Sequence, residues 1–190
     1  TIILTGAVEA NIETAPEDTD EKEKPFFIPP EVFERQIDTL LKHGFIPITF
    51  EDLTDAYLGK SALPEKPVLI TIDDGALNAY TNAFAVLKKK NIKANIFLIT
   101  DKIGRDKNFL TWEQVFEMQK SGLVGFGSHT ANHKRLRSIS DEEILSELTK
   151  SKQTLEEKLG VDITAFCYPY GAGAFDKRVR PLVFKAGYLF

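Results

Sequence analysis

The stretch from Val68 to Gly75, with the sequence VLITIDDG, constrains the fold of this chain more than any other. Its first five residues are β-branched or leucine, and such an unbroken run predicts a strand buried on both faces. Asp73 and Asp74 then end the strand. Two adjacent carboxylates at this position are costly, because burial and like charge both disfavour ionisation. A metal ion bound by one of them would offset that cost, although Asp-Gly is also a common turn signal.

Length and composition limit the possible classes of protein. A chain of 190 residues with 43% hydrophobic content predicts a single domain over residues 1–190. The net charge of −4 argues against nucleic acid as the main partner, because it gives the sequence no basic footprint. One cysteine excludes an internal disulfide. There is no apolar run long enough to cross a bilayer and no signal-peptide pattern. Membrane anchoring through a segment outside this chain stays open, and the sequence does not indicate an oligomeric state.

Strand and helix patterns alternate along the chain, which predicts an α/β fold with parallel βα units. The expected strands are residues 1–5, 46–48, 68–72, 94–99, 124–128 and 164–168, with another from 188; the expected helices are residues 30–43, 51–58, 78–90, 112–121, 141–159 and 179–186. Right-handed crossovers bring the C-terminal ends of such strands to one rim, where a βα barrel builds its active site. The segments 73–74, 129–133 and 168–171 all follow strands, so one site could collect them.

Two of the three histidines, His129 and His133, lie four residues apart. In a helical turn this spacing places both imidazoles on one face, where they can reach the same ion. Two imidazoles with one carboxylate suit zinc or a similar divalent metal, and they leave positions open for water and substrate. The alternative is a pair of polar loop residues with no shared role.

Three segments carry a resemblance to a known family. TIDDG at 71–75 resembles the Thr-Phe-Asp-Asp-Gly motif of the polysaccharide deacetylase family, also called carbohydrate esterase family 4 or the NodB homology domain. HTANH at 129–133 is similar to its His-Ser/Thr-x-x-His motif. FCYPYG at 166–171 resembles the third motif in the form found in poly-N-acetylglucosamine deacetylases. The similarity extends from about Phe26 onward, with residues 30–53 resembling the segment before the catalytic strand in that subgroup.

The resemblance implies a distorted (β/α) barrel of the NodB type and a metal-dependent hydrolase. Such an enzyme removes N-acetyl groups from a β-linked N-acetylglucosamine polymer, with poly-N-acetylglucosamine the first candidate. The resemblance also implies that Asp74, His129 and His133 bind a divalent metal, zinc first, with cobalt or nickel as alternatives. Asp73 would be the general base, and the backbone N–H of Tyr170 would stabilise the oxyanion. This substrate class implies an extracellular or cell-envelope location.

The sequence also departs from the family pattern. The third motif usually carries an arginine that orients the base; Cys167 or Tyr168 stands near that place, so we expect this restraint on Asp73 to be missing. The family's general acid is a histidine, and no histidine follows His133. Later motifs have no counterpart before Phe190, so we expect the domain to lack its C-terminal elements.

Two other functions stay open. The same chemistry could act on peptidoglycan or on a chitin oligomer. A non-catalytic glycan-binding relative could keep the fold and the metal. Asp73 favours an enzyme, because a protein that only binds glycan needs no base beside a metal ligand. The missing acid histidine favours the binding module.

Overall fold

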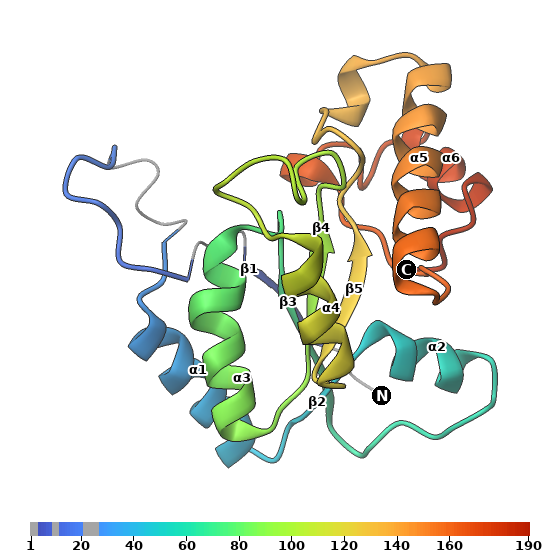
Figure 1. Ribbon diagram of the computed structural model, residues 1–190. Helices are drawn as coiled ribbons and strands as arrows, with labels where there is room; N and C mark the ends of the chain where they lie inside the picture. Colours follow the sequence, from blue (N-terminus) through green and yellow to red (C-terminus); the bar gives the residue numbers. More distant parts are fainter. Residues whose placement is uncertain (1–3, 9–11, 21–26) are drawn as a thin grey trace.

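The computed structural model describes residues 4–8, 12–20 and 27–190. Its strands form one parallel sheet in the order β1-β3-β4-β5, with β2 paired to β3. The sheet is curled into a half-barrel with the helices around it (Figure 1), which confirms the expected distorted (β/α) barrel of the NodB type. The strands are β1 (Leu4–Val8), β2 (Ile46–Ile48), β3 (Pro67–Ile72), β4 (Ala94–Leu98) and β5 (Val124–Ser128).

Strand β3 is the centre of the sheet. All six of its residues are buried, as the apolar run predicts for a strand covered on both faces. It pairs with β1 along one edge, and with β2 and then β4 along the other. The two carboxylates that follow it therefore leave the middle of the sheet.

The side chain of Asn95, on β4, closes the fork where β2 and β4 diverge along β3. Its Nδ2 donates to the carbonyls of Ile48 and Ile70, at 3.1 and 3.2 Å, and its Oδ1 accepts from the backbone N–H of Phe50 at 2.9 Å. Asn95 is almost completely buried. One amide thus satisfies three backbone groups that the diverging strands leave without a ladder partner.

The helices begin where the sequence signals place them. Thr49, Thr111 and Ser140 each cap a helix in a capping box, which satisfies N–H groups that the first turn leaves free. The segment expected as one helix from residue 78 to 90 consists of a π-helical turn followed by an α-helix. The helices are α1 (Pro30–Lys42), α2 (Phe50–Tyr57), α3 (Phe84–Lys90), α4 (Trp112–Lys120), α5 (Asp141–Leu159) and α6 (Val179–Lys185), with the short turns η2 (Ala79–Ala83), η3 (Leu136–Ser138) and η4 (Pro169–Gly171).

Helices α1 and α3 lie to the left of the sheet in Figure 1, and α5 and α6 lie to the right. The lysines at the end of α3 join it to α1: Lys89 lies 2.7 Å from Glu34, and Lys90 lies 3.0 Å from Glu34 and 2.6 Å from Asp38. Lys89 and Lys90 therefore help to hold α3 against α1. Among the described residues, every helix is too short or too polar to cross a bilayer.

Three expected strands differ from the structure. The first was expected over residues 1–5; residues 1–3 lie outside the described part, and β1 begins at Leu4. The strand expected over 164–168 is reduced to one parallel bridge, between Ser128 and Phe166. Phe166 N–H also donates to the carbonyl of Phe190 at 2.9 Å, so this segment still continues the sheet locally beyond β5. The strand expected from residue 188 is not formed over the described residues 188–190, although Leu189 N–H donates to the carbonyl of Thr164 at 2.8 Å.

Candidate metal centre

The rim at the carboxyl ends of the strands collects the residues that the sequence singled out. Asp73 and Asp74 follow β3, and His129 and His133 follow β5. Cys167 N–H donates to the carbonyl of Ser128 at 2.9 Å, which brings the third segment beside the other two. The convergence predicted from the βα alternation is thus present in the structure.

Asp74, His129 and His133 form a compact group of potential ligands. Asp74 Oδ1 lies 3.3 Å from Nε2 of each histidine, and the two Nε2 atoms are 3.0 Å apart. A divalent ion about 2.1 Å from each of three ligands separates those ligands by roughly 3.0–3.4 Å. The spacing and the two-imidazole, one-carboxylate chemistry both fit a zinc-like ion.

The two histidines do not lie on a helical turn, so that part of the prediction was wrong. Residues 129–133 form a loop in which Thr130 and His133 have φ angles of 67° and 61°. Thr130 Oγ1 accepts from the backbone N–H of His133 at 2.8 Å and closes this turn. The loop still brings the imidazole rings together, with centroids 4.7 Å apart.

The orientation of His129 leaves Nε2 available to a metal. Its Nδ1 lies 2.9 Å from the carbonyl oxygen of Cys167. A carbonyl oxygen can only accept, so Nδ1 carries a proton, and in the neutral imidazole Nε2 is the atom with a lone pair for a metal. The residue is 1% exposed, and this arrangement is fixed by packing.

The pKa directions differ within the group: those of Asp74 and His129 favour a positive charge beside the carboxylates, whereas that of His133 does not. Burial raises the pKa of Asp74, but the hydrogen bond and charge of His129 outweigh burial and hold that pKa below its usual value. Burial lowers the pKa of His129, but the hydrogen bond that protonated His129 donates to Asp74, with the charges of Asp73 and Asp74, outweighs burial and raises that pKa. Burial and the charge of His129 lower the pKa of His133. A bound cation would supply Asp73 and Asp74 with the positive charge that protonated His129 otherwise supplies.

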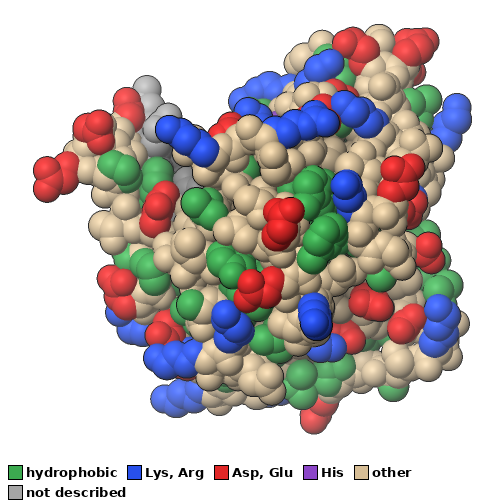
Figure 2. All heavy atoms as spheres, viewed as in Figure 1, with side chains coloured by type: hydrophobic (Ala, Val, Ile, Leu, Met, Phe, Trp, Pro, Cys, Tyr) green, Lys and Arg blue, Asp and Glu red, His purple; other side chains and the backbone are tan. Residues whose placement is uncertain are grey.

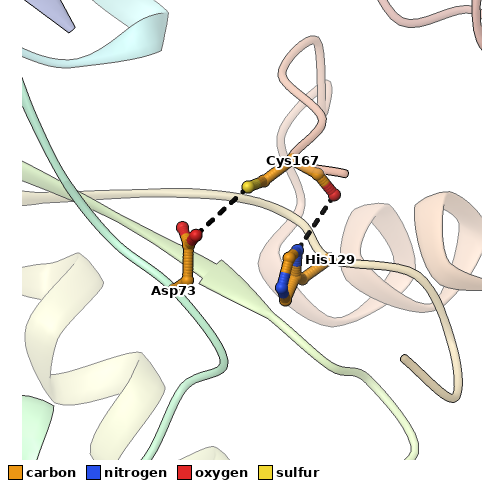
Figure 3. Close-up of side chains that lie close together, drawn as sticks. All are labelled: Asp73, His129 and Cys167. Atoms are coloured by element: carbon orange, nitrogen blue, oxygen red, sulfur yellow. Dashed lines mark hydrogen bonds between the residues drawn. The ribbon is translucent and has the colours of Figure 1, made fainter. Parts of the chain in front are cut away.

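Asp73 has a restraint that the sequence did not predict. The Cys167 thiol donates to Asp73 Oδ2 at 3.3 Å, while the Cys167 carbonyl contacts His129 (Figure 3). The usual arginine was expected to be missing, and at that place the Cys167 thiol supplies a different restraint on Asp73. Asp73, His129 and Cys167 also have potential ligand atoms close together. The thiol and Nδ1 are already engaged in hydrogen bonds in this second group, which favours the Asp74 set for a metal.

Tyr170 lies over the second histidine. It is 49% exposed, its φ angle is 57°, and its ring centroid lies 4.5 Å from that of His133. The guanidinium carbon of Arg135 lies 3.9 Å from the same ring, a cation–π contact. Tyr170 thus belongs to the site through its side chain as well as through the backbone segment that the sequence indicated.

Left-handed backbone is concentrated at the rim. The described non-glycine residues with positive φ include Asp74, Thr130, His133 and Tyr170; the remaining one, Asn91, ends α3. Such conformations cost of order 1–3 kcal/mol each and persist where surrounding contacts over-determine them. Their gathering around one cluster of ionisable groups marks a functional site.

A polar hollow of about 730 Å³ adjoins the histidine loop through Asn132. Lys and Arg side chains gather along the same upper edge of the molecule in Figure 2, where the strands of Figure 1 end. Such a lining can form many hydrogen bonds with a hydrated ligand. The hollow is lined by Asp101, Lys102, Arg105, Asp106, Lys107 and Asn132.

This architecture defines an α/β half-barrel protein with a candidate metal site at the carboxyl ends of its parallel strands. The profile of the family described as polysaccharide deacetylase matches residues 60–190, and the chain belongs to that family.

Similar proteins include a poly-beta-1,6-N-acetyl-D-glucosamine N-deacetylase of Staphylococcus aureus, 31% identical over 82% of this chain and 57% of that protein. Among solved structures, the Streptococcus pyogenes deacetylase PplD in complex with acetate has a TM-score of 0.83 at 25% identity, covering 98% of this chain and 80% of that one. IcaB from Ammonifex degensii has a TM-score of 0.79 at 28% identity, covering 99% of this chain and 84% of that one. The chain spans a little over half the length of the curated relatives it matches.

Proposed function

We propose that residues 1–190 form a single catalytic domain that removes N-acetyl groups from a β-linked N-acetylglucosamine polymer. The observation that carries the proposal is the convergence of Asp74, His129 and His133, with the buried carboxylate of Asp73 beside them. The similarity to a poly-N-acetylglucosamine deacetylase and to IcaB supports poly-N-acetylglucosamine as the substrate. This substrate class supports an extracellular or cell-envelope location.

In this proposal Asp74, His129 and His133 hold a divalent metal, with zinc as the first choice. When bound, the metal polarises the acetyl carbonyl and makes water a better nucleophile at neutral pH. Asp74 serves as a ligand and is not free to act as a base, so the neighbouring carboxylate takes that role.

Asp73 accepts the proton of the attacking water. It is 6% exposed, and the Cys167 thiol holds Oδ2 in a fixed direction, so little reorganisation is needed when the proton moves. The backbone N–H of Tyr170 donates to the developing oxyanion. Removing one such donor costs roughly 10²–10³ in rate.

The test is metal content together with deacetylase activity on N-acetylglucosamine oligomers. Asp73→Asn should keep the metal and lose turnover, because the amide cannot accept the proton. His129→Ala and Asp74→Ala should lose the metal itself. Dialysis against a chelator should abolish wild-type activity, and zinc should restore it.

Glu34→Gln, where α1 contacts α3, is the matched control and should behave as wild type. Equal metal loss in Asp73→Asn and His129→Ala would refute the division between base and ligand. Bound metal without turnover in the wild type would instead indicate a binding module, and no bound metal would refute the site.

A further inference from the structure

Glu147 is a charged residue on the apolar face of α5. It is 5% exposed, and its neighbours on that face include Ile144, Leu148 and Leu155, all fully buried. Glutamate is almost never this buried unless its carboxylate is paired. A carboxylate on the apolar face of an amphipathic helix is unusual in a sequence, and Glu147 lies outside the three family motifs.

The Glu147 carboxylate accepts hydrogen bonds from the loop that carries both histidines. Oε2 accepts from the backbone N–H of Asn132 at 2.8 Å, and Oε1 accepts from Asn132 Nδ2 at 3.2 Å. Lys134 Nζ lies 3.6 Å from Oε1 and balances part of the charge. Both carboxylate oxygens therefore bind Asn132, the residue directly before His133.

The loop needs such an anchor because its backbone is strained. Thr130 and His133, on either side of Asn132, are both left-handed, and Thr130 is β-branched, which makes that conformation more costly. On its other side the loop is held by the segment after β4, where the N–H of Asp101 donates to the carbonyl of Ala131 at 3.0 Å.

Helix α5 supplies further contacts from the same face. Ser151, one turn after Glu147, shares a 2.7 Å hydrogen bond with Ser128, the residue before His129. Lys150 lies 2.6 Å from Asp101. Residues 147, 150 and 151 thus form a polar stripe that faces the ends of β4 and β5, and Glu147 is its member on the histidine loop.

We propose that Glu147 is a positioning residue that sets the metal affinity of the site by holding the 129–133 loop in its strained conformation. This inference rests on the proposed metal role of Asp74, His129 and His133. With both hydrogen bonds made, the two imidazoles are already oriented before a metal arrives. Without them, binding must also order the loop, and affinity falls by that cost.

The test uses Glu147→Gln in the metal-free 190-residue chain, titrated with Zn²⁺ alone. Glutamine keeps the shape but loses the negative charge, so both hydrogen bonds to Asn132 lose their charge assistance. The side-chain hydrogen bond survives only if the Asn132 amide rotates by about 180°. The expected result is a roughly tenfold weaker Zn²⁺ affinity, in the range of residues that support metal ligands. The Asn132 backbone amide should also exchange faster with solvent in the metal-free protein.

Glu143→Gln is the matched control. Glu143 also lies near Lys134, at 3.5 Å, but it is exposed and does not touch the loop, and glutamine can keep its place in the capping box of α5. It should bind Zn²⁺ as the wild type does. Asn132→Ala keeps the backbone hydrogen bond and loses the one from Nδ2, so affinity should fall by roughly threefold.

Wild-type affinity and wild-type exchange of the Asn132 amide in Glu147→Gln would overturn the inference. If Glu147→Gln fails to fold, the Zn²⁺ affinity of Asn132→Ala is the deciding measurement. An affinity equal to that of the wild type would then overturn the inference. If the wild type itself binds no Zn²⁺, the proposed function fails. The exchange rate of the Asn132 amide in Glu147→Gln then still decides whether Glu147 holds the loop.

Discussion

The surface between α1 and α3 and the rim at the carboxyl ends of the strands use the same side-chain chemistry under opposite conditions. On the first surface, Glu34 and Asp38 meet Lys89 and Lys90 at 2.6–3.0 Å, and each of the closest pairs has one exposed member, Lys89 or Asp38. At the rim, Asp73, His129 and Glu147 are at most 6% exposed. Distances alone do not distinguish the two regions; access to water does.

The difference predicts how each region responds to substitution. Water replaces a lost partner on the α1–α3 surface at little cost. At the rim a lost partner leaves a polar group without water, and the cost spreads to every group in the network. The rim also stores strain in left-handed residues, whereas α1 and α3 are regular helices. Substitutions in the two regions should therefore differ in kind as well as in size.

The largest effect outside the ligands and the base is expected for Cys167→Ala. The variant loses the thiol hydrogen bond to Asp73 but keeps the backbone carbonyl that orients His129. We expect kcat to fall by about tenfold, the value of one hydrogen bond to a charged group, with KM and metal content unchanged. Steady-state kinetics with metal analysis measures this.

Cys167→Ser is the companion variant, because its hydroxyl is also a donor. It should recover much of the lost kcat. Equal loss of metal in both variants would mean that Cys167 acts through packing around His129, and would break the proposed link to the base.

Asp52 is intermediate between the two regions, and its effect should be intermediate too. It accepts from Thr49 in the cap of α2 and from Lys93 at 2.8 Å. Burial raises the pKa of Asp52, but the Lys93 hydrogen bond and the Thr49 N–H outweigh burial and lower it. After allowance for solvent screening, Asp52→Asn should cost about 0.5 kcal/mol at neutral pH.

The sign of the pH dependence follows from the lowered pKa. The folded state favours ionised Asp52, so its contribution is present above the unfolded pKa and is lost as pH falls through the folded value. Urea unfolding of wild type and Asp52→Asn should differ at pH 7 and converge in acid. A difference that grows in acid would contradict the assignment.

Glu34→Gln should have the smallest effect. Its pairs with Lys89 and Lys90 lie at the surface, partly exposed, where water can replace them. The midpoint of thermal unfolding should therefore not change measurably, and high salt should not alter that result. A large shift would show that the α1–α3 surface behaves like the rim, and the comparison would fail.

The sequence was sufficient for most of the fold because its signals are local. The apolar run of β3 and the capping residues Thr111 and Ser140 each act within a few positions of themselves. The segment at 164–168 was less predictable, since whether an apolar stretch pairs fully depends on its neighbours. The fork between β2 and β4 is closed by Asn95, whose partners are distant in sequence.

The candidate site was found through its motifs, but its internal geometry was not. The spacing of His129 and His133 suggested a helical turn, whereas hydrogen bonds with Thr130 and Glu147 stabilise a strained loop instead. The contact of Cys167 with Asp73 joins residues 94 positions apart, and no spacing rule indicates it. Residues that bind or react leave a local pattern, while residues that hold them depend on the completed fold.

The three hydrogen bonds of Asn95 have a consequence for the order in which the protein can fold during synthesis. The partner groups at residues 48 and 50 are made 45 or more positions earlier. Strand β2 can pair with β3 before residue 95 is made, but until then the backbone groups at residues 48 and 50 lack the Asn95 side chain and must stay bonded to water. The last polar groups of the N-terminal half are therefore satisfied only when β4 arrives.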